Sequence, residues 1–139
     1  MKREAWVTNA LKRCCHDIRR IFLVGAWLLL FVIAAFSVIP PDYRVATDVP
    51  HVVEHFAAFL LLGLAFGLGY PRRYLAQSVF LLLFTAAIEL AQLWTPGRHA
   101  RFSDVLVNSL GVTFGIALAY LVARDRQKAG NNPRVDFAP

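Results

Sequence analysis

The sequence consists of four long apolar runs separated by short polar segments. The runs cover residues 21–39, 51–69, 75–94 and 104–122, and each is followed closely by proline, glycine or charged residues. A helix needs about 20 apolar residues to cross the hydrocarbon layer of a membrane, which is roughly 30 Å thick. Each run has about that length, and together they take up most of the chain. The pattern predicts an all-α polytopic membrane protein with four transmembrane helices.

The segments at the two ends of the chain are polar and basic. Residues 1–20 form a basic leader, and residues 123–139 are charged and rich in Gly, Asn and Pro, which is typical of a flexible tail. Hydrophobic residues make up 58% of the 139 residues and charged residues 17%, which leaves no room for a soluble domain. We therefore expect one four-helix membrane domain over residues 21–122, between a leader and a tail.

The basic residues predict how the chain is oriented. Of the 15 Lys and Arg residues, only Arg44, Arg98 and Arg101 fall in the loops after the first and third runs. Because Lys and Arg concentrate on the cytoplasmic side, we expect both termini to be cytoplasmic. The first run is longer than the apolar part of a signal peptide, about 7 to 15 residues, so we interpret it as a retained span. The net charge of +6 comes from residues at the ends of the runs, and no nucleic-acid partner is expected.

Polar and ionisable residues occur inside the runs, where an ionised side chain costs about 2.5 to 3.5 kcal/mol. At about 100° per residue, four polar residues share one face of the third run: Ser78, Thr85, Glu89 and Gln92. One narrow face of the fourth run carries Asp104, Asn108, Gly111 and Gly115. The predicted topology puts Glu89, Asp104 and Asn108 near the outer surface, together with His51, Glu54 and His55 of the second run. We expect a three-helix polar cluster that opens outward, with residues 96–103 as its lid.

The charged residues of this cluster have alternative roles. Glu89 and Arg98 are either an ion pair that holds the lid or the carboxylate and cation of a ligand site. Ser103 and Asp104 are typical of a helix start, where a carboxylate accepts from free N–H groups. Asn108 is more typical of a hydrogen bond between helices. Arg98, His99 and Arg101 beside a helix N-terminus favour phosphate, and the alternative is nonspecific contact with lipid headgroups.

The segment "HVVEH", His51 to His55, has the H-x-x-E-H spelling of inverted zinc hydrolases. On a helix, His51 and His55 could share a metal with Glu54 as base. Three fixed positions arise easily by chance, however, and Pro50 puts His51 in the first helical turn. We therefore predict no metal and no cofactor, and His51 and His55 are the candidate ligands if one binds.

The motifs resemble those of the VanZ-like family of small bacterial membrane proteins. The resemblance covers about residues 40–122 and rests on "EHFAAFLLLG" and "ELAQLWTPGRHARFSDVLVNSLG". The family's second-helix signature has an Asp-Lys pair where this sequence has His51 and Val52, while His55 and Phe56 match. The family is named for a member linked to teicoplanin resistance. The resemblance thus implies a multi-pass protein of the bacterial cytoplasmic (inner) membrane that acts in the cell envelope.

Two functions follow as hypotheses. In the first, the outer cluster binds an anionic membrane lipid or a lipid-linked wall precursor and affects teicoplanin susceptibility. The residues expected to carry this function are His55, Glu89, Gln92, Arg98, Arg101, Asp104 and Asn108. In the second, the protein is an intramembrane enzyme or carrier for a lipid phosphate, with Glu89 or His55 in proton transfer. We favour the first, because no nucleophile or phosphate loop is evident. The Gly-x-x-x-Gly faces predict close helix packing, within the chain or in a homo-oligomer.

Overall fold

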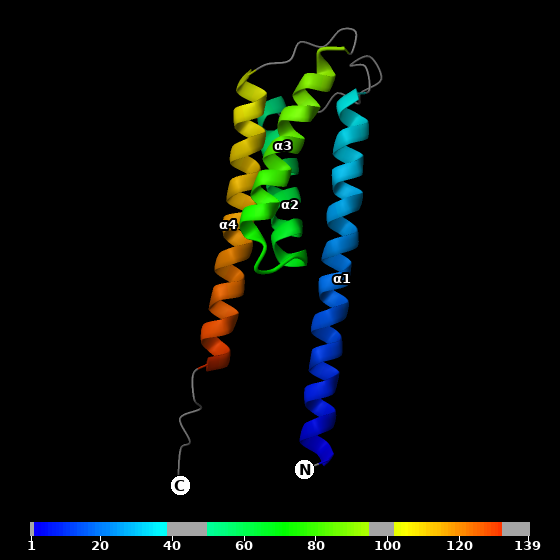
Figure 1. The fold of residues 1–139 in the computed structure, drawn as a ribbon, viewed down its shortest axis with the longest axis vertical. Coiled ribbons are helices and arrows are strands. Elements are labelled where there is room, and N and C mark those ends of the chain that lie inside the picture. The colour runs from blue at the N-terminus through cyan, green and yellow to red at the C-terminus, as the bar shows by residue number, and fades with distance from the viewer. Residues whose placement is uncertain (1, 39–49, 95–101, 132–139) are drawn as a thin grey trace.

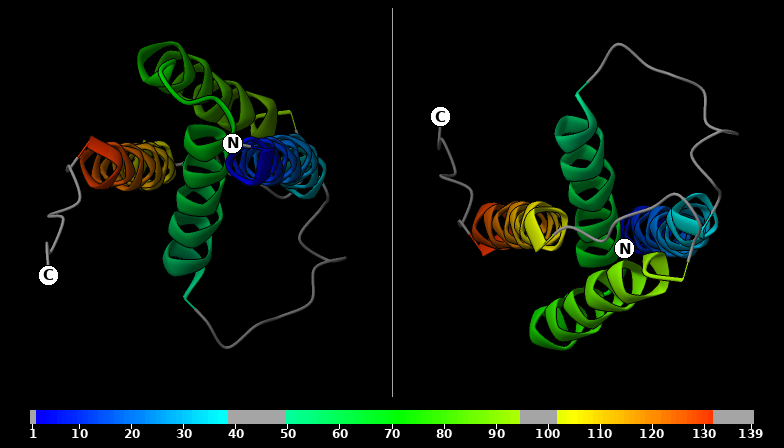
Figure 2. Two further views of the ribbon diagram at one scale, coloured as in Figure 1. Left: turned by 90° about the horizontal axis from the view of Figure 1, so that it is seen from below. Right: turned by 90° about the horizontal axis from the view of Figure 1, so that it is seen from above.

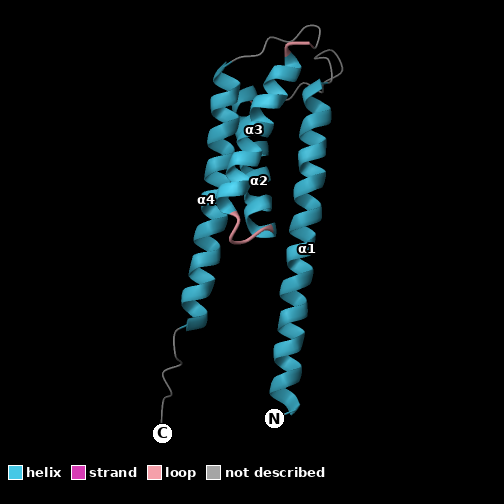
Figure 3. Cartoon of the chain, in the orientation of Figure 1, coloured by secondary structure: helices cyan, strands magenta, loops and turns pink. Residues whose placement is uncertain are grey.

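The computed structural model describes residues 2–38, 50–94 and 102–131, which form four helices (Figures 1 and 3). These are α1 (Lys2–Val38), α2 (His51–Gly69), α3 (Tyr74–Gln92) and α4 (Phe102–Asn131). All four are long and apolar enough to cross a membrane. The predicted all-α class with four spans is therefore confirmed.

The beginning of α1 and the end of α4 lie at the same end of the bundle, together with the α2–α3 turn (Figure 1). We call this the termini end and the opposite one the loop end. An even number of spans requires the two chain ends to share a side of the membrane. Which side of the membrane the termini end faces stays a prediction.

Two helices are longer than the apolar runs that predicted them. Helix α1 has 37 residues, which at about 1.5 Å each is longer than the hydrocarbon layer is thick. Its candidate span covers only His16–Ser37, so the basic leader continues the helix beyond it. Helix α4 continues to Asn131, which corrects the expectation of a loose segment after residue 122. Charged residues end an apolar run but not a helix, because Arg, Lys, Gln and Ala favour helix formation. Residues 132–139 lie outside the described part.

The α2–α3 turn has a clear local cause. Pro71 follows the C-terminal end of α2, and Arg72 has a positive φ of 75°, which reverses the direction of the chain. Helix α3 then begins at Tyr74, so α2 and α3 form a tight hairpin. This turn places the C-terminal end of α2 and the N-terminal end of α3 together at the termini end.

Helix α2 lies between α1 and α4, with α3 to one side (Figure 2). The buried core is made mainly of large apolar side chains from α2, α3 and α4, including Phe59, Leu62, Leu81 and Val112. Many other large apolar side chains point outward, such as Phe31 at 71% exposure and Leu83 at 66%. An apolar outer surface of this extent is suited to lipid rather than water.

Helices α2 and α4 approach each other through their glycines. A Cβ atom on Gly115 would meet the carbonyl oxygen of Leu60 and lie 2.6 Å from the amide nitrogen of Leu64. A Cβ atom on Gly63 would meet the carbonyl oxygen of Val112. The predicted close packing is therefore present within one chain. Association of copies through the same faces would require α2 and α4 to separate, and the homo-oligomer stays a prediction.

Candidate functional site

Polar side chains are buried near the loop end, in the part of the bundle where α2 begins and α3 ends. Thr85, Glu89 and Gln92 of α3 are all buried, and Asn108 of α4 is 0% exposed. His55 of α2 is half-buried beside them. Thr85, Glu89 and Gln92 belong to the face predicted for the third run, and Asn108 belongs to the face predicted for the fourth. The structure thus brings together the polar stripes predicted on the third and fourth helices.

Three of these side chains form one hydrogen-bonded network, which we call the loop-end network: His55, Asn108 and Glu89. The Oδ1 atom of Asn108 lies 3.2 Å from Nδ1 of His55. The Nδ2 group of Asn108 donates to Oε1 of Glu89 at 3.3 Å. An amide oxygen only accepts, so Nδ1 of His55 carries the proton in this arrangement. The network joins α2, α4 and α3 through a single asparagine.

The histidine end of the network lies closest to the surface. His51 is exposed, and its ring lies 4.1 Å from that of His55, measured between centroids. On its other side, the His55 ring is stacked on Phe59 with a centroid distance of 6.5 Å. Contacts with Asn108 and Phe59 therefore hold the orientation of the His55 ring.

Gln92 and Asp104 occupy different environments from the network. Gln92 is 4% exposed, and its Nε2 group has no hydrogen-bond partner among the described residues. Asp104 is half-buried in the first turn of α4, and its Oδ1 atom accepts a hydrogen bond from the Ser103 hydroxyl at 3.3 Å. Because α4 begins at Phe102, Ser103 and Asp104 lie inside the first turn, not at the boundary we expected. A carboxylate there is still favoured by the positive end of the helix dipole.

The predicted cations of the site lie outside the described residues. Arg98, His99 and Arg101 fall in residues 95–101, which separate α3 from α4. The expected ion pair of Glu89 with Arg98 and the expected anion site beside α4 therefore stay predictions. What the structure describes is the buried polar side of the predicted cluster.

Sequence reasoning missed two buried side chains of the bundle, Gln77 and Phe59. Gln77 is buried at 5% exposure, while Ser78, which we had placed in the stripe, is half-buried and donates to the carbonyl oxygen of Tyr74. Both lie at the termini end of α3, so neither belongs to the network. Phe59 was also missed as the ring beneath His55. Its spacing of four residues from His55 was the available signal, because such pairs face each other on a helix.

In the part of the chain that the structure describes, His51 and His55 have no third side chain placed to complete a zinc site. Residues 2–38, 50–94 and 102–131 contain no group of three or more His, Cys, Asp or Glu side chains arranged to hold a metal ion. His51 and His55 lie close together, but their contact is between two rings tilted by 35° to each other.

The fold and the loop-end network together define a polytopic helical membrane protein with a buried polar site near one end of its helix bundle. The model of the VanZ/LLP1 family matches residues 7–123. The chain therefore belongs to the VanZ/LLP1 family, and the match includes the first span, which the resemblance over residues 40–122 left out. No curated protein and no solved structure matches the chain.

Proposed function

We propose that the loop end of this protein binds an anionic lipid or a lipid-linked wall precursor in the bacterial cytoplasmic membrane. The observation that carries the proposal is the loop-end network, in which Asn108 joins His55 to the buried Glu89. Ionisable groups inside a membrane are costly and are kept mainly where they serve a function. A second support comes from the sequence, in which Arg98 and Arg101 lie between Glu89 and Asn108 of the network.

The network is suited to present His55 to a phosphate group. With Nδ1 donating to Asn108, a protonated His55 directs its second N–H, on Nε2, away from that contact. A protonated imidazole and two guanidinium groups are the donors that phosphate prefers, because charge-assisted hydrogen bonds are the strongest. Glu89 offsets part of this positive charge within the protein. An effect on teicoplanin susceptibility belongs to the same proposal, as a consequence of binding a wall precursor.

The proposal predicts that His55→Gln releases a bound lipid. Glutamine retains an N–H group that can donate to Asn108, but it cannot become a cation. The lipid bound at the loop end should fall about tenfold or more, the effect of one lost charge-assisted hydrogen bond. Wild-type and variant proteins would be purified under the same conditions, and their lipids would be extracted, identified by mass and compared with the whole membrane.

His16→Gln is the matched control, because His16 is exposed on α1 at the termini end and, within the described part of the chain, forms an ion pair only with Asp17, at 3.8 Å. We expect it to retain the lipid that His55→Gln loses. The lipid mass separates a phospholipid from a lipid-linked precursor. Identical lipid contents in wild type, His55→Gln and His16→Gln would contradict the proposed function.

A further inference from the structure

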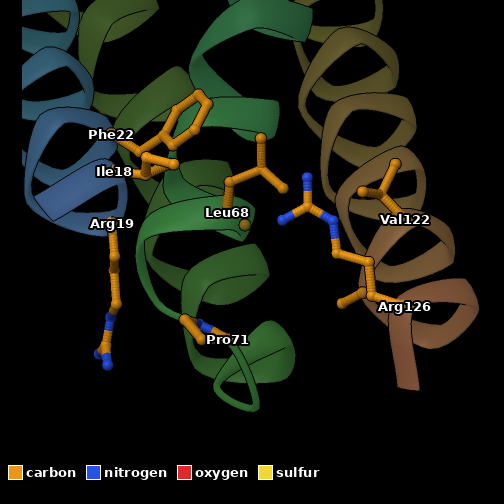
Figure 4. A pocket seen from close by; sticks show the side chains of 9 residues that line it. Ile18, Arg19, Phe22, Leu68, Pro71, Val122 and Arg126 are labelled. Carbon is orange, nitrogen blue, oxygen red and sulfur yellow. The ribbon is translucent and has the colours of Figure 1, made fainter. Parts of the chain in front are cut away.

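A cavity lies at the termini end, away from the loop-end network. It has a volume of about 290 Å³ and opens between α1, α2 and α4 (Figure 4). Its lining combines apolar side chains with two arginines: Ile18, Arg19, Phe22, Leu68, Val122 and Arg126. A volume near the lower limit of ligand pockets, about 300 Å³, suits a headgroup and its first carbon atoms rather than a whole lipid.

The cavity lies at the depth where the spans end. The apolar run of α1 begins at Ile21 and that of α4 ends at Val122, so the lining residues Arg19 and Arg126 lie just outside these runs. Helix α2 ends at Gly69, between the lining residues Leu68 and Pro71. The cavity therefore lies where apolar side chains give way to basic ones, the composition expected at the border between hydrocarbon and headgroups. A molecule that enters it from the membrane would bring its headgroup to the arginines.

The two arginines have different roles. The Nε group of Arg19 donates to the carbonyl oxygen of Gly69 at 2.9 Å, which satisfies a carbonyl at the end of α2. In Figure 4, the Arg19 side chain extends toward the level of Pro71, whereas the Arg126 guanidinium extends from α4 toward Leu68. Among the described residues, Arg126 has no ion-pair partner. Arg126 is therefore the lining cation that an anionic group in the cavity would meet.

The charge around the cavity is strongly positive. Around the cavity, residues 13–20, 70–73 and 122–128 carry two carboxylates, Asp17 and Asp125. The same region carries Arg13, Arg19, Arg20, Arg72, Arg73, Arg124, Arg126 and Lys128. Clusters of basic residues beside membrane spans attract anionic lipids through their charge. This charge adds a long-range attraction to the local site at Arg126.

We propose that this cavity binds an anionic phospholipid of the leaflet at the termini end. The phosphate lies at Arg126, and the glycerol and first methylene groups lie against Phe22, Leu68 and Val122. The acyl chains continue along the outer apolar surface, where Ile21 is 69% exposed and Leu121 is 50% exposed. A zwitterionic lipid gives Arg126 no net charge to neutralise, and a free phosphate leaves the apolar wall uncovered. The site is independent of the proposed function, because it uses no residue of the loop-end network.

The test measures lipid binding by native mass spectrometry in detergent, with dioleoylphosphatidylglycerol and dioleoylphosphatidylcholine as probes. Wild type should bind the phosphatidylglycerol more tightly than the phosphatidylcholine. Arg126→Ala should weaken phosphatidylglycerol binding about tenfold, while Arg126→Lys should retain part of it. Arg124→Ala is the matched control, because it removes the same charge from the same helix without touching the cavity, and it should bind like wild type.

A second variant tests the cavity without changing any charge. Ala123 lines the cavity, and Ala123→Trp should fill it and weaken phosphatidylglycerol binding while all arginines remain. Equal losses in Arg124→Ala and Arg126→Ala would show diffuse surface attraction and overturn the proposal. So would unchanged binding in Ala123→Trp, equal binding of the two lipids by wild type, or displacement of the lipid by equimolar inorganic phosphate. Retention of the loop-end lipid by Arg126→Ala distinguishes this site from the proposed function.

Discussion

Gly115→Ala should lower the free energy of unfolding by about 1 to 3 kcal/mol, although alanine is the better helix former. The new methyl group would meet the carbonyl oxygen of Leu60 and lie 2.6 Å from the amide nitrogen of Leu64. Both are backbone atoms, so no side chain can rotate to make room. Helices α2 and α4 would have to move apart and would lose packing around Val112. Unfolding of the purified protein by sodium dodecyl sulfate, followed by circular dichroism, measures the effect.

Gly25→Ala provides a control, in which the free energy of unfolding should not fall. A Cβ atom on Gly25 meets nothing within 4 Å, so only the helix propensity changes. This substitution should leave stability unchanged or raise it by as much as about 1 kcal/mol. If the Gly115→Ala protein proved as stable as the Gly25→Ala protein, this result would contradict the close packing of α2 against α4 at Gly115.

Asn108→Leu should have the second large effect, a loss of about 1 to 3 kcal/mol of stability. Leucine is similar in size, so the cost does not come from a cavity. It comes from removing the one amide that bonds to both His55 and Glu89. Because Asn108 is 0% exposed, water cannot take its place without entering the helix bundle. The same detergent unfolding assay measures the loss.

A double-mutant cycle separates this hydrogen bond from simple packing. Replacing both partners of a buried polar pair costs less than replacing one, so Asn108→Leu combined with Glu89→Leu should be less destabilising than the sum of the two single changes. Thr113→Val is a matched control on α4, because Thr113 is exposed and its hydroxyl donates only to the carbonyl oxygen of Ser109. Strict additivity in the cycle, or an equal cost for Thr113→Val, would argue against the network.

Helical periodicity alone predicted much of this fold and part of the site. Four apolar runs, each long enough to span a membrane, predicted the four helices. The rotation of 100° per residue predicted that Glu89 and Asn108 face the inside of the bundle, where both are buried. Both predictions depend only on neighbours within one helix. The same reasoning failed at the end of α4, where the loss of apolar residues was interpreted as the end of the helix. Charge and helix formation are separate properties, and α4 continues to Asn131.

Contacts between helices could not be predicted in this way. That Asn108 bonds to His55 and Glu89 depends on the rotation and vertical shift of three helices relative to one another. The glycine spacings of α2 and α4 likewise fit a contact within one chain as well as a contact between copies. The structure shows the internal contact, in which Gly63 faces Val112 and Gly115 faces Leu60. The cavity at Arg126 had no sequence signal, because its lining comes from three separate helix ends.

The most direct test of the central claim, that the loop end binds an anionic lipid, is photocrosslinking in intact membranes. A photoreactive amino acid would replace Leu106, which is 50% exposed on α4 near Asn108, or Leu75, which is 79% exposed at the opposite end of the bundle. We expect the lipids crosslinked at position 106 to be enriched in one phosphate-bearing species relative to the bulk membrane, and His55→Gln to abolish that enrichment. Crosslinked lipids that match the bulk membrane at both positions would contradict the claim.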